Sequence, residues 1–93
     1  MNVNIAELKT LQIKMINKVK VSPIPMKIKA VIIDEIFKVQ MPLSVYHKKN
    51  NMIILAEFKG KIVTKVDSRL NELKLNPIQI DKILDVIRKA NLI

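Results

Sequence analysis

Few side chains in this sequence have the types and spacing that catalysis needs. His47 is the only histidine among 93 residues, and its neighbours Tyr46 and Lys48 provide no carboxylate to orient it as a general base. Asp34 and Glu35 are adjacent, so on a helix their carboxylates diverge by about 100°. No Ser-His-Asp order with an elbow glycine, glycine-rich phosphate loop or HExxH motif occurs. We therefore expect no catalytic residue and no enzyme activity.

Metal and cofactor binding have equally little support. Asp81 and Asp85 are four residues apart and could face one another on a helix, but a metal ion would need further ligands. The absence of cysteine excludes a disulfide scaffold, a zinc finger and thiol catalysis. We expect no metal site, no cofactor and no small-molecule substrate.

The lysines indicate a function more clearly. The chain has 17 Lys+Arg against 8 Asp+Glu, which gives a net charge of +9. Lysines cluster around the loops of a predicted β-hairpin, where long cationic side chains can reach the phosphates of a duplex. The same lysines could instead protect an edge strand from aggregation. The predicted nucleic-acid-binding residues are Lys48, Lys49, Lys59, Lys61 and Lys65.

This charge is unevenly distributed. Residues 1–66 carry twelve basic and four acidic side chains (+8), whereas residues 67–93 carry five and four (+1). A basic part beside a near-neutral part is typical of a polyanion-binding surface joined to a structural or partner-binding segment. Because 15 of the 17 cations are lysine, we expect contact with the backbone and little reading of base sequence. An acidic protein partner, or an AT-rich coding bias without function, would explain the same excess.

Three helices are predicted around the lysine-rich segment. Residues 4–20 carry apolar side chains at helical spacing, with Asn4 as N-cap and Glu7 three residues later. Residues 26–40 also show a broad apolar helical face, and a proline stops them. Asn76 and Pro77 are typical of the start of a last helix.

Between these helices the pattern predicts strands. The β-rich runs 52–58 and 61–66 flank Lys59-Gly60, which contains the only glycine, so we expect a β-hairpin. Residues 43–47 are predicted as a short strand or a helical turn, and a short helix is expected from 67 or 68 to 75. The predicted fold class is α+β, in a single domain over residues 1–93.

The order of these elements loosely resembles a winged-helix domain, with Lys59-Gly60 as the tip of the wing. A recognition helix should directly precede the hairpin, and only residues 42–50 are available for it. This resemblance implies a fold and, as an alternative function, a DNA-binding transcriptional regulator; it assigns no residue roles.

The last helix suggests a protein partner. Its apolar residues exceed what a terminal helix of so small a domain easily buries, although they could simply close the core. The predicted partner-binding residues, for a larger subunit or a second copy, are Ile83, Ile87, Leu92 and Ile93.

The sequence therefore predicts a non-enzymatic accessory protein of a DNA replication or transcription machine. It would hold DNA or RNA backbone nonspecifically and dock on a larger protein. A protein-only adaptor for an acidic partner is a further alternative. No run of about 20 apolar residues and no signal peptide is visible, so we expect a cytoplasmic protein without membrane contact, associated with the nucleoid if it binds DNA.

Overall fold

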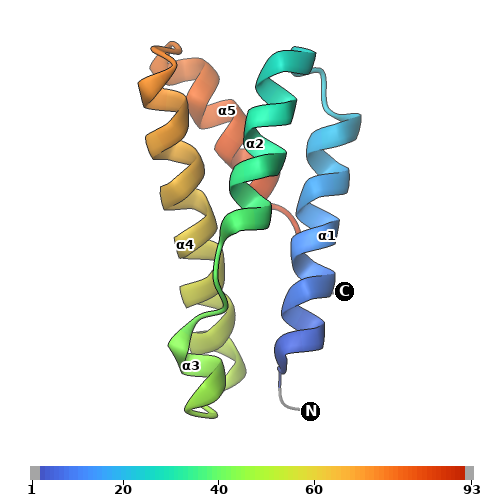
Figure 1. The fold of residues 1–93 in the computed structure, drawn as a ribbon, viewed down its shortest axis with the longest axis vertical. Helices are drawn as coiled ribbons and strands as arrows, with labels where there is room; N and C mark the ends of the chain where they lie inside the picture. Colours follow the sequence, from blue (N-terminus) through green and yellow to red (C-terminus); the bar gives the residue numbers. More distant parts are fainter. Residues whose placement is uncertain (1–2, 92–93) are drawn as a thin grey trace.

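The computed structural model describes residues 3–91, and this part of the chain contains helices and no strand. Four long helices form an up-and-down bundle of 38 × 22 × 19 Å, with a short helix near one end (Figure 1). Helix α1 packs against α2 and α5, and α4 packs against the same two helices, so α1 and α4 lie at opposite corners. The helices are α1 (Ile5–Val21), α2 (Met26–Lys38), α3 (Leu43–Tyr46), α4 (Asn51–Glu72) and α5 (Pro77–Arg88).

Asparagine side chains determine where three of these helices begin. The Oδ1 atoms of Asn4 and Asn50 each accept a hydrogen bond from the backbone N–H three residues further on, at 2.9 and 3.0 Å. Asn76 caps α5 in a similar way, and Pro77 occupies its first turn, where a missing N–H costs nothing. The predicted first and last helices are therefore confirmed, and so is the second, since α2 follows Pro25 directly.

The predicted β-hairpin is wrong, because residues 51–72 form one continuous helix, α4. Both predicted strands and the supposed turn at Lys59-Gly60 lie inside this helix. An apolar side chain recurs every fourth residue from Ile54 to Leu70, and each one is buried. Burial of this stripe outweighs the β-propensity of the individual residues. The fold class is thus all-helical rather than α+β.

The continuous helix α4 has further consequences for the predictions. Without a hairpin there is no wing, so the resemblance to a winged-helix domain fails. The short helix expected up to residue 75 is the C-terminal part of α4, which ends at Glu72. Residues 43–46 form the helical turn α3, one of the two forms expected there.

Apolar side chains from α1, α2, α4 and α5 meet in one core. The buried Gln12 amide donates a hydrogen bond of 2.7 Å to the carbonyl oxygen of Ile36, which joins α1 to the last turn of α2. The largest fully buried side chains are Phe58, Leu8, Leu11, Met15, Ile32, Ile36, Ile54, Ile62, Leu70, Ile87, Val19 and Val66.

Helices α2 and α5 both end near the middle of α4. Lys38, the last residue of α2, lines the same groove as Gly60. On the other side, Lys59 Nζ donates to the carbonyl oxygen of Arg88, the last residue of α5, at 3.3 Å. The second half of α4 therefore lies in a cross-section of the bundle that contains all four long helices, which we call the four-helix level. Beside the first half of α4 lies a level formed by α1, α3 and α4 (Figure 1).

Candidate nucleic-acid interface

The five predicted lysines occupy three separate places. Lys61 and Lys65 are one turn apart on α4 and face the C-terminal end of α2. Lys59 points to the opposite side of α4, towards the end of α5. Lys48 and Lys49 lie in the loop between α3 and α4, at the far end of the bundle. The structure thus brings together two of the five residues.

Lys61 and Lys65 line a groove of about 550 Å³ between α2 and α4, which we call the α2–α4 groove. Its lining residues include three lysines, a threonine and a glutamine, and its surface is about equally polar and apolar. Three lysines, one hydroxyl and one amide can all donate hydrogen bonds into it. The lining residues are Lys38, Val39, Gln40, Gly60, Lys61, Thr64 and Lys65.

Lys38 is the cation that α2 contributes to this groove. Its Nζ lies 2.7 Å from Asp34 Oδ2, one turn earlier on the same helix, and both side chains are exposed to solvent. The hydrogen bond and the charge of Asp34 raise the pKa of Lys38 above its ordinary value. Lys38 therefore remains a cation at neutral pH. The pair adds stability below the ordinary lysine pKa, and this contribution is lost as the pH rises through the raised pKa.

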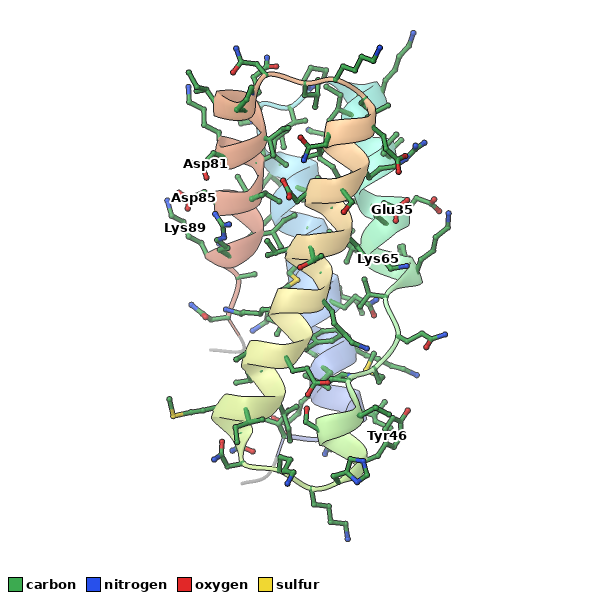
Figure 2. All side chains as sticks on the ribbon, turned by 90° about the vertical axis from the view of Figure 1, so that its left-hand side faces the viewer. Glu35, Tyr46, Lys65, Asp81, Asp85 and Lys89 are labelled. Carbon is green, nitrogen blue, oxygen red and sulfur yellow. The ribbon has the colours of Figure 1, made fainter. Side chains whose placement is uncertain are left out.

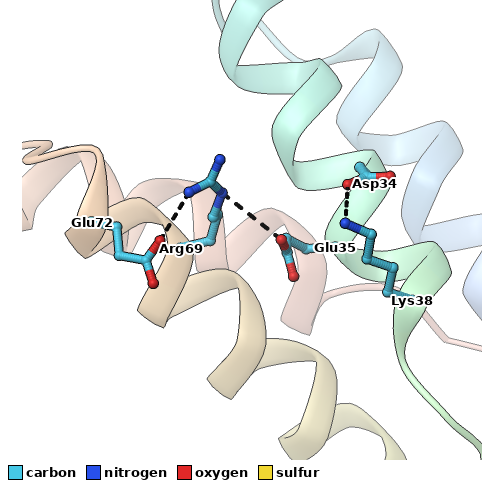
Figure 3. Close-up of polar contacts among 5 residues, drawn as sticks. All are labelled: Asp34, Glu35, Lys38, Arg69 and Glu72. Atoms are coloured by element: carbon cyan, nitrogen blue, oxygen red, sulfur yellow. Dashed lines mark hydrogen bonds and ion pairs between the residues drawn. The ribbon is translucent and has the colours of Figure 1, made fainter.

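Towards the four-helix level, carboxylates limit the cationic surface. Arg69 of α4 lies between Glu35 of α2, at 3.8 Å, and Glu72 of its own helix, at 2.9 Å (Figure 3). Figure 2 shows Glu35 and Lys65 on the same side of the bundle, where α2 meets α4. The Arg69 guanidinium is thus already paired within the fold. Lys61 and Lys65 of the α2–α4 groove precede Arg69 on α4.

Lys59 has a structural role in this arrangement. Its ammonium donates to the carbonyl oxygen of Arg88 at 3.3 Å and to Asn91 Oδ1 at 3.0 Å. A cation at the C-terminal end of a helix satisfies carbonyl groups that have no helical partner and interacts favourably with the helix dipole. Lys59 thereby ties the end of α5 to the middle of α4.

Lys48 and Lys49 belong to a different surface. Lys48 adopts a left-handed backbone conformation with φ of 51°, and the Lys49 N–H donates to the carbonyl oxygen of Ser44 at 3.1 Å. Both lysines line a hollow beside the start of α1. They precede α4, and about three turns of this helix separate its start from Lys61, so they do not form one site with the α2–α4 groove.

The two predicted partner-binding residues that the structure describes, Ile83 and Ile87, lie in the interior. Ile87 is fully buried and Ile83 is 7% exposed, so both contribute to the core. Leu92 and Ile93 lie outside the described residues.

A second, apolar groove opens beside Ile83, between the α1–α2 turn and α5, with a volume of about 310 Å³. We call it the end groove. Exposed apolar side chains of Val21, Met26 and Ile78 lie at the same end of the bundle. Its lining residues are Ser22, Pro23, Ile24, Pro25, Ile28, Leu75, Gln79, Lys82, Ile83 and Val86.

The remaining side chains considered for catalysis or metal binding are either paired with a cation or isolated. Asp81 pairs with Arg88 at 3.6 Å and Asp85 with Lys89 at 3.4 Å, and Figure 2 shows this row of charges on α5. His47 is exposed at the end of α3. Within residues 3–91, no group of three or more His, Cys, Asp or Glu side chains could hold a metal ion. None of the helices in this range has the length and apolar character needed to cross a bilayer.

The sequence prediction missed Lys38, Gln40, Thr64 and Gly60 as members of one site. With residues 51–72 interpreted as a helix, the spacing of Gly60 and Thr64 beside Lys61 and Lys65 would have placed these four on neighbouring faces. Lys38 and Gln40 carry no such signal, because they reach the groove only through the packing of α2 on α4.

No protein-family model, curated protein or solved structure matches this chain.

Proposed function

We propose that this protein is a non-enzymatic accessory protein of a nucleic-acid machine that holds DNA or RNA backbone in the α2–α4 groove. The observation that carries the proposal is the convergence of Lys38, Lys61 and Lys65 from two helices on one groove. Asp34 pairs with Lys38, and Glu35 and Glu72 line the adjoining hollow beside Arg69. Phosphate oxygens are the ligands that suit such a set of donors, and their neutralisation releases counterions.

The arginines favour contact without sequence reading. Bidentate arginine contacts are the commonest means of recognising a guanine edge. The chain has two arginines, and both pair with carboxylates of the fold: Arg69 with Glu35 and Glu72, and Arg88 with Asp81. The lysines that remain act as point charges, which suits nonspecific backbone contact.

The test is fluorescence anisotropy with a labelled duplex of about 30 base pairs and arbitrary sequence, titrated at several salt concentrations. We expect affinity that falls steeply with salt and depends little on sequence. The variant Lys61→Glu/Lys65→Glu should bind at least about tenfold more weakly. Its control, Lys9→Glu/Lys18→Glu, makes the same change in net charge on α1, at the opposite corner of the bundle.

Three outcomes would contradict the proposal. An equal loss in both double variants would mean that net charge alone causes binding. A strong preference among duplex sequences would contradict backbone contact. Absence of binding at low salt, with duplex DNA, duplex RNA and single strands alike, would favour the protein-only adaptor for an acidic partner.

The proposed docking on a larger protein is assigned to the end groove. Its lining is mainly apolar and contains one cation, Lys82, and no acidic residue. Lys20 at the end of α1 and Lys29 in the first turn of α2 add positive charge beside this turn, and Lys29 Nζ donates to the carbonyl oxygen of Lys20 at 2.6 Å. These features suit an acidic amphipathic helix, which would place apolar side chains in the groove and carboxylates at its rim.

A synthetic helix with leucine on one face and glutamate on the other provides the probe. Backbone NMR shifts should be concentrated at the end groove, and Lys82→Glu should weaken binding several-fold. Lys74→Glu, which changes a lysine outside the lining, is the matched control. Shifts centred on Gly60 and Thr64 would mean that the peptide occupies the α2–α4 groove and would contradict this assignment.

A further inference from the structure

Gly60 is the only glycine in the chain, and it lies in the middle of α4. Neither backbone nor packing requires a glycine there. Its φ is not positive, and a Cβ built on it would meet nothing within 4 Å. Glycine in a helix interior is among the least favourable residues for stability, second only to proline. The fold therefore carries a cost at residue 60 that no contact within the described residues explains.

The position of Gly60 supplies an explanation. It forms part of the lining of the α2–α4 groove, with Thr64 one turn further along the same face and Lys61 and Lys65 beside them. Its N–H takes part in the helix, so the glycine offers space rather than a hydrogen-bond donor. A ligand can approach the axis of α4 more closely here than at a residue that carries a side chain.

We infer that Gly60 is the seat of a single backbone phosphate, which the ammonium groups of Lys61 and Lys65 and the hydroxyl of Thr64 hold against α4. This inference depends on the proposed function and names the point at which the polyanion makes its closest contact. The carbonyl oxygens at the C-terminal end of α2 repel an anion, so the phosphate belongs on the α4 side, and Lys38 faces it across the groove.

A side chain at residue 60 should therefore stabilise the protein and obstruct the ligand. Gly60→Ala should raise the melting temperature by about 2–8 °C, because alanine is the better helix former. Gly60→Leu should weaken duplex binding about tenfold and lower the log–log salt slope by about one, the change expected for one lost phosphate contact. The control Ala30→Leu adds bulk at an exposed site on α2, two turns before Lys38.

The outcomes separate this inference from the proposed function. Reduced affinity and slope in Gly60→Leu, with Ala30→Leu unchanged, would support the phosphate seat. If Gly60→Leu binds like the wild-type protein while Lys61→Glu/Lys65→Glu does not, the seat is wrong and the groove remains the interface. If Gly60→Ala lowers the melting temperature, the glycine serves the fold and the inference fails. If the wild-type protein binds no nucleic acid, the proposed function fails first.

Discussion

The α2–α4 groove and the end groove lie in one small bundle and differ in almost every respect. The first has about 550 Å³ and is lined by three lysines and a single apolar side chain, Val39. The second has about 310 Å³ and is lined mainly by apolar side chains and one lysine, Lys82. The sequence assigns the charge to residues 1–66 and the partner surface to residues 67–93. In the fold, the lining of the α2–α4 groove lies entirely within residues 1–66, whereas the end groove combines residues 22–28 with residues 75–86. The predicted basic part therefore contains the cationic groove, but the apolar groove depends on the packing of α5 beside the α1–α2 turn.

The largest effect should follow from removing the charge of the α2–α4 groove. Replacing Lys38, Lys61 and Lys65 together with glutamine should lower the log–log salt slope by about 2–3 and duplex affinity by about 100-fold. Binding of the acidic probe helix at the end groove should stay within about twofold, because no residue of that groove changes. Anisotropy and NMR titrations measure the two effects separately. A parallel loss of binding at both grooves would show that the two grooves are not independent sites.

A smaller effect should distinguish two lysines of the same helix. Lys59→Gln removes the ammonium at the end of α5 and should lower the free energy of unfolding by about 0.5–1 kcal/mol. Lys61→Gln should leave stability nearly unchanged and weaken duplex binding instead. Chemical denaturation and anisotropy on both variants test this difference between the two lysines. If Lys59→Gln weakened duplex binding and Lys61→Gln lowered stability, the ligand would lie on the α5 side of α4.

The smallest effect concerns the carboxylate beside Lys38. Asp34→Asn removes the hydrogen-bonding anion that raises the pKa of Lys38, so that pKa should move back towards its ordinary value. Duplex affinity should increase about two- to threefold, because the groove gains one net positive charge. NMR titration of the Lys38 side chain and anisotropy measure the two changes. Unchanged affinity with a shifted pKa would place the ligand away from α2.

Local signals in the sequence were sufficient for part of this fold. Asn4 and Asn76 cap their helices as predicted, because capping depends on residues a few positions apart. The interpretation of 52–66 failed since its β-branched residues and single glycine resemble a hairpin when seen locally. Only burial against α2 and α5 determines the helix. The same limit applies to the candidate site: Lys61 and Lys65 could be selected from the sequence, whereas the contribution of Lys38 depends on helix packing.

Because α2 and α5 both end near the middle of α4, we expect the two halves of α4 to differ in their protection from hydrogen exchange. Beyond Gly60 the helix lies between α2 and α5, while residues 51–59 have α3 beside them and share a hollow with the start of α1. Amide hydrogens of the second half should therefore exchange with solvent only when the whole bundle unfolds, and those of the first half through smaller local openings. The proposed phosphate seat lies at the boundary between these cooperative units, so a bound polyanion would suppress the local openings and slow exchange in the first half of α4.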